Sequence, residues 1–214
     1  MGWMAPVKRW IVCTTGFLQH EGDATGTEIL QDAIHRLCSC ADTRVLLKSW
    51  RDNPQDLARR IHHHTPDDSR PTVILVGYSY GGYTSVLIAR ELRKYGIDVE
   101  WLILCDPVWR PRFLINYWLS MLDVFSIRVP NNVHNLFITR QSFDYPRGAG
   151  IKLEDETRTS WIRPDHDIVY PEIPHRNIDK VSMEFKKKAM EEACPKAEAL
   201  KTVAPHKLSD LKAE

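Results

Sequence analysis

The chain has 214 residues, of which 43% are hydrophobic and 27% charged, a composition typical of one globular domain. Its formal net charge is +1, so no broad basic field argues for a nucleic acid or an anionic membrane as partner. No apolar run is long enough for a secretory leader or a membrane span, and the five cysteines show no disulfide framework. We therefore expect free thiols and a cytoplasmic location.

The residue pattern predicts strands that alternate with helices along the chain. Strands are expected at residues 9–15, 43–50, 72–78, 99–106 and 133–140, and helices at residues 25–40, 54–63, 81–95 and 177–193. This alternation is typical of a mostly parallel sheet that helices cover on both faces, so the predicted fold class is α/β.

Local signals mark the ends and faces of these helices. Thr25 and Glu28 fit a capping box at the start of the first helix, and Gly96 is placed to end the third. The inner stripe of the first helix is expected to be Ile29, Ala33 and Leu37. That of the last helix is expected to be Ile178, Val181, Phe185 and Ala189.

The turn GYSYG, at residues 77–81, joins a buried strand to an amphipathic helix and has Ser79 at its centre. Gly77 and Gly81 stand where side chains would collide with neighbouring backbone. A turn of this kind strains the serine backbone and exposes its hydroxyl at the carboxyl edge of the sheet, where ligands of parallel sheets bind. The pattern indicates a nucleophile elbow, G-x-S-x-G, although a glycine-rich packing turn also fits it.

Over roughly residues 9–193 the chain resembles the α/β-hydrolase superfamily. The resemblance rests on the elbow GYSYGG, on the aspartate after the next strand, and on a late histidine before the last helix. It implies a minimal α/β-hydrolase fold without the leading antiparallel strands. It also implies a Ser–Asp–His triad in that chain order, with Ser79 as the nucleophile.

The resemblance favours His175 as the base, because His175 follows Pro174 and directly precedes the last helix. His166 is the alternative. The three consecutive histidines at residues 62–64 are interpreted as a solvated helix end, since neighbouring positions converge poorly on one metal ion. We expect neither a metal nor a cofactor.

The acid has two candidates. Asp106 ends the strand after the elbow helix, which is the position used by thioesterase-like members of the superfamily. Asp144 comes one strand later and also fits an ordinary turn aspartate before Tyr145 and Pro146. Asp106 is favoured. For the oxyanion, the resemblance implies two backbone N–H donors, one from Tyr80 and one from Phe17.

We expect one domain over residues 1–194 and a charged tail over residues 195–214. Residues 107–131 follow the expected acid and carry an aromatic helical face. They fit a cap or lid over an acyl pocket as well as they fit a helix packed on the sheet or a subunit interface.

The predicted function is that of a serine esterase, lipase-like or thioesterase-like, which cleaves small-molecule carboxylic esters or thioesters through an acyl-enzyme. Two alternatives stay open. One is an amidase or peptidase with the same triad, and the other is a catalytically silent binding protein on the same scaffold. The sequence sets neither the acyl chain length nor the oligomeric state.

Overall fold

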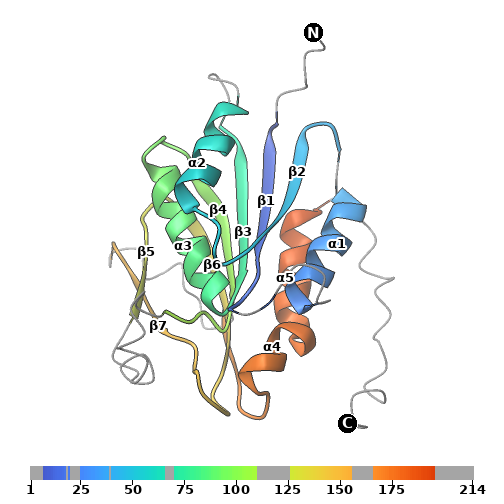
Figure 1. The fold of residues 1–214 in the computed structure, drawn as a ribbon, viewed down its shortest axis with the longest axis vertical. Coiled ribbons are helices and arrows are strands. Elements are labelled where there is room, and N and C mark those ends of the chain that lie inside the picture. Colours follow the sequence, from blue (N-terminus) through green and yellow to red (C-terminus); the bar gives the residue numbers. More distant parts are fainter. Residues whose placement is uncertain are drawn as a thin grey trace.

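The computed structural model describes residues 7–17, 19, 25–38, 40–65, 70–109, 126–155 and 166–195. Its centre is a six-stranded sheet in the order β2-β1-β3-β4-β6-β8, and all of its strand pairs are parallel (Figure 1). Its strands are β1 (Arg9–Thr14), β2 (Thr43–Lys48), β3 (Thr72–Tyr78), β4 (Val99–Cys105), β6 (Val133–Gln141) and β8 (Asp167–Tyr170). A second sheet pairs β5 (Ser126–Val129) with β7 (Gly150–Leu153).

Helices cover both faces of the central sheet, which confirms the predicted α/β class. Figure 1 shows α2 (Pro54–His63) and α3 (Tyr80–Arg93) on one face. The other face carries α1 (Gly26–Cys38), α4 (His175–Val181) and α5 (Met183–Ala193). Alternate residues of β3 enter the two cores: Val73 and Leu75 pack with the α2–α3 side, and Ile74 and Val76 with the α1–α5 side. A strand buried on both faces needs a continuous apolar run.

The first helix begins as predicted but presents a different face to the core. The Thr25 hydroxyl accepts the N–H of Glu28 at 3.1 Å, which is one of the two bonds of the predicted capping box. The predicted stripe is wrong, because Ile29 is 51% exposed and Leu37 is 44% exposed. Leu30 and Ile34 are the buried pair. At the start of α1, Gly26 lies so close to the backbone of Asp179 that a Cβ on it would collide with that backbone.

The predicted last helix, over residues 177–193, is two helices. The break is at Ser182, whose backbone is extended and whose hydroxyl accepts the N–H of Phe185 at 3.3 Å. Ser182 therefore caps the start of α5. Of the buried face predicted for this region, Ile178, Phe185 and Ala189 are fully buried, whereas Val181 is only partly buried.

Cys38 and Cys194 form a disulfide, so the expectation of free thiols is wrong for these two residues. The bond joins the end of α1 to the residue after α5, and the two Cα atoms are 5.6 Å apart. The partners are 156 residues apart in sequence, and only the packing of both helices on one face brings them together. Cys13, Cys40 and Cys105 are free thiols. Because two of the five cysteines form a disulfide, the cysteines do not support the expected reducing compartment.

Part of the expected cap and tail lies outside the described residues. This applies to residues 110–125 within the predicted cap, and to residues 196–214 of the predicted tail. Within the expected cap range, Ser126–Val129 forms β5. None of the helices in the described part of the chain combines the length and apolar character that crossing a bilayer requires.

Candidate active site

Ser79 is the single residue between β3 and α3, and its backbone is strained, with φ 53° and ψ −127°. Its backbone N–H donates to the carbonyl of Cys105 at 3.0 Å, and its carbonyl accepts the N–H of Val108 at 2.9 Å. At Gly81 a Cβ would collide with the carbonyl oxygens of Thr14 and Thr15, so only glycine fits there. These contacts fix the sharp turn that the sequence predicted at GYSYG.

The base candidate lies against the serine hydroxyl. His175 is the first residue of α4, and its Nε2 atom is 2.8 Å from Ser79 Oγ. The other ring nitrogen, Nδ1, is 2.5 Å from Oδ2 of Asp106. The structure thus brings Ser79, His175 and Asp106 into one hydrogen-bonded series, although their positions span 96 residues of the sequence.

Asp106 is fixed by its own surroundings. It follows β4 with φ 44°, a conformation that few residues other than glycine adopt, and it is completely buried. Its Oδ1 atom accepts the backbone N–H of Gln141 at 3.2 Å, and its Oδ2 atom faces the imidazole. One oxygen is therefore held by the end of β6 while the other orients His175.

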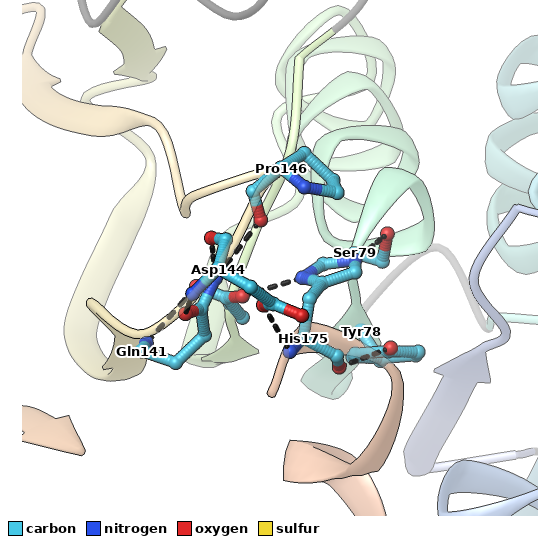
Figure 2. A network of polar contacts seen from close by, with 7 residues as sticks. Tyr78, Ser79, Gln141, Asp144, Pro146 and His175 are labelled. Carbon is cyan, nitrogen blue, oxygen red and sulfur yellow. Dashed lines mark hydrogen bonds and ion pairs between the residues drawn. The ribbon is translucent and has the colours of Figure 1, made fainter. Parts of the chain in front are cut away.

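Asp144 lies near the same histidine but does not contact its ring. Its Oδ1 atom accepts the backbone N–H of His175 at 2.7 Å. Gln141 holds the Asp144 loop by accepting the N–H of Asp144 at 2.9 Å and by donating to the carbonyls of Asp144 and Pro146. Figure 2 shows Asp144 and Gln141 on one side of His175, with Ser79 and Tyr78 on the other.

Tyr78 supports His175 from the elbow side. Its hydroxyl donates to the carbonyl oxygen of His175 at 2.6 Å, and its ring stacks on the imidazole with centroids 5.3 Å apart. Burial raises the pKa of the Tyr78 phenol, so it remains a hydrogen-bond donor. No sequence motif marks this role, although Tyr78 immediately precedes the nucleophile candidate.

The two expected oxyanion donors lie in segments that flank Ser79. Tyr80 is the next residue and begins α3. The loop of Phe17 passes close by, since a Cβ on Gly16 would be 3.1 Å from Ser79 Cβ. Both side chains contact the ring of Trp50, with centroid distances of 4.8 Å from Phe17 and 5.4 Å from Tyr80. Trp50 had no motif to mark it in the sequence.

His166, the alternative base, and the histidines at the end of α2 lie elsewhere. His166 precedes β8, with ring centroids 5.8 Å from Trp101 and 6.1 Å from Phe137. His62, at the end of α2, stacks on Tyr95 at 4.6 Å. Within the described residues, no group of three or more His, Cys, Asp or Glu side chains is arranged to hold a metal ion.

Several solved protein structures are similar to the structure of this chain. No model of a known protein family matches the sequence, and no curated protein matches it. The NocB thioesterase domain from the nocardicin cluster is 17% identical, with 88% of this chain and 95% of that chain covered and a TM-score of 0.42. A protein described as a hydrolase of the α/β superfamily, from Xanthomonas campestris pv. campestris, is 14% identical over 88% of this chain and 96% of its own, with a TM-score of 0.46.

YbtT, described as a type II thioesterase from the yersiniabactin pathway, is 14% identical over 89% of this chain and 94% of its own, with a TM-score of 0.43. The α/β fold expected from the sequence is present: a parallel sheet covered on both faces, with an elbow turn after β3.

Proposed function

We propose that the protein is a serine hydrolase that cleaves carboxylic esters or thioesters of small molecules through an acyl-enzyme. The observation that carries the proposal is the series Ser79 Oγ to His175 Nε2 at 2.8 Å and His175 Nδ1 to Asp106 Oδ2 at 2.5 Å. A serine hydroxyl becomes a useful nucleophile when a neighbouring base accepts its proton and an acid orients that base.

In the acylation step, Ser79 Oγ attacks the carbonyl carbon of the substrate while His175 Nε2 takes the hydroxyl proton. The Asp106 carboxylate accepts the Nδ1–H of the ring, which fixes the tautomer and stabilises the imidazolium that forms. His175 then gives its proton to the leaving alcohol or thiol, and the acyl group stays on Ser79.

In the deacylation step, water enters the position that the leaving group has vacated. His175 accepts a proton from this water, which attacks the acyl carbon and releases the acid and free Ser79. Both steps pass through an oxyanion, for which the backbone N–H groups of Tyr80 and Phe17 are the proposed donors. The positive end of the α3 dipole points at the same place.

A substrate panel tests this proposal. Wild type and Ser79→Ala are compared on p-nitrophenyl esters of graded acyl length, on a matched thioester and on a matched anilide. We expect ester or thioester turnover in wild type and a loss of several orders of magnitude in Ser79→Ala. Ser126→Ala, in the second sheet, is the matched control and should keep wild-type turnover.

Two results would overturn the proposal. Cleavage of the anilide alone would identify an amidase, and the absence of turnover on the whole panel would favour a silent binding protein.

A further inference from the structure

The side chain of Gln19 connects two segments of the proposed site. Its Oε1 atom accepts the backbone N–H of Gly16 at 2.8 Å, and its Nε2 atom donates to Oδ2 of Asp179 at 3.2 Å. Gly16 precedes Phe17, one of the proposed oxyanion donors. Asp179 lies in α4, four positions after His175 and therefore one helical turn away.

The backbone of Gln19 also sets the direction of the Phe17 N–H. The N–H of Gln19 donates to the carbonyl oxygen of Gly16 at 3.2 Å. This carbonyl belongs to the same peptide group as the N–H of Phe17. Because that peptide group is planar and trans, its N–H points away from its C=O. A Gly16 carbonyl held toward Gln19 therefore fixes the opposite direction for the proposed oxyanion donor.

Asp179 is a rigid anchor for this arrangement. It is completely buried, and its Oδ2 atom also accepts the backbone N–H of Thr27, near the start of α1, at 3.2 Å. Its Oδ1 atom has no hydrogen-bond partner in the described part of the chain. The backbones of Gly26 and Asp179 are in close contact. The Gln19 amide is thus tied to the point where α1 meets the helix that carries His175.

We propose that Gln19 is a positioning residue of the oxyanion hole, which holds the Phe17 N–H in a fixed relation to Ser79 and His175 through its bonds to Gly16 and Asp179. The inference rests on the proposed function of Ser79. An oxyanion donor interacts most strongly with the charge that develops in the transition state. Loss of Gln19 should therefore lower kcat and leave KM nearly unchanged.

Two substitutions at Gln19 separate its two side-chain bonds. Gln19→Ala removes both and leaves the backbone bond from the Gln19 N–H to the Gly16 carbonyl. Gln19→Glu keeps an acceptor for the Gly16 N–H and loses the donor to Asp179. Gln55→Ala, on the exposed face of α2, is the matched control. The readouts are kcat and KM for p-nitrophenyl acetate, the second-order rate of Ser79 labelling by a fluorophosphonate, and the thermal unfolding midpoint.

We expect Gln19→Ala to lower both kcat and the labelling rate by between about 10-fold and 100-fold, as a misplaced catalytic group does. KM should change by less than about threefold. Gln19→Glu should also have a lowered kcat and labelling rate, because it places a second carboxyl group next to that of Asp179. Asp179→Asn keeps an acceptor oxygen for Gln19, so it should lower kcat and the labelling rate less than Gln19→Ala does. Gln55→Ala should match wild type in every readout.

The outcomes that overturn the inference differ from those that overturn the proposed function. Wild-type kcat and labelling in Gln19→Ala, or a rise of KM alone, would exclude a positioning role while Ser79 remains a labelled nucleophile. A loss in Asp179→Asn as large as in Gln19→Ala would assign the effect to the Asp179 charge instead. Failure of the fluorophosphonate to label wild-type Ser79 would overturn the proposed function and, with it, this inference.

Discussion

The carboxylate of Asp144 accepts the backbone N–H of His175 at 2.7 Å, while the ring of the same histidine is bonded by Asp106. From the sequence, both aspartates could be the acid of a triad. The contacts give them different positions: Asp106 faces Nδ1, and Asp144 caps the first turn of α4. A carboxylate at a helix start is favourable because the N–H groups there lack partners within the helix.

The two aspartates should respond differently to the same substitution. Asp106→Asn places an amide against Nδ1 and favours the wrong imidazole tautomer, so kcat should fall by roughly 10⁴-fold. Asp144→Asn keeps a carbonyl oxygen for the His175 N–H and should cost less than about tenfold. Steady-state hydrolysis of p-nitrophenyl acetate measures both. The opposite ranking would assign the acid to Asp144.

The two late histidines make a matched pair for testing the base. His175→Ala should be nearly as damaging as the loss of Ser79, because these two residues act as one unit. His166→Ala should be mild, since His166 lies among the rings of Trp101 and Phe137 rather than near Ser79. The same ester assay ranks the variants. Full activity in His175→Ala would show that His175 is not the base.

Asp179 should make stability depend on pH. Burial raises the pKa of its carboxyl, an effect opposed by the bonds from Gln19 and Thr27 and by the charges of Lys180 and Lys186. Between its unfolded and folded pKa values the native state binds more protons than the unfolded state. The free energy of unfolding therefore falls as pH rises through that window.

Asp179→Asn should accordingly be more stable than wild type at neutral pH, because it removes the cost of a buried charge and keeps an acceptor oxygen. The gain should shrink as pH falls toward the unfolded carboxyl value of about 4. Chemical denaturation at several pH values measures this. Asp56→Asn, exposed on α2, is the control and should show no such trend. A gain independent of pH would show that the Asp179 charge is not its source.

The disulfide should contribute to stability. Cys38 and Cys194 close a loop whose ends are 156 residues apart, for which the chain-entropy model gives up to about 5 kcal/mol. Denaturant unfolding with and without reductant measures the loss, and Cys40→Ser should not change it. Thiol titration of the unfolded, unreduced chain should find only Cys13, Cys40 and Cys105. All five cysteines titrating would contradict the bond.

The three residues of the proposed triad could be singled out from the sequence because the elbow pattern marks Ser79 and the resemblance to the α/β-hydrolase superfamily points to the positions of Asp106 and His175. Ser79 is in the elbow, Asp106 ends a buried strand, and His175 opens a helix. Parallel strands end at one edge of the sheet, so residues at such ends come together in the fold. Their distances could not be predicted, and their catalytic roles stay predictions.

Other features of the structure depend on packing between distant segments, which local sequence patterns do not indicate. In α1, Ile29 and Leu37 have the same helical spacing as a buried stripe, yet the packed helix buries Leu30 and Ile34 instead. The bond from Gln19 to Asp179 joins residues 160 positions apart. The strands β5, β7 and β8 have four residues each, too few for a clear alternation of apolar and polar positions.

The role of Ser79 is tested most directly by labelling the protein with a fluorophosphonate, mapping the modified residue by mass spectrometry, and following ester turnover in the same samples. We expect one label per chain, on Ser79, with turnover lost in proportion to labelling. Ser79→Ala should take up no label and keep less than about a thousandth of wild-type turnover. Labelling at another residue, or turnover in Ser79→Ala above about a tenth of wild type, would contradict the assignment of Ser79 as the nucleophile.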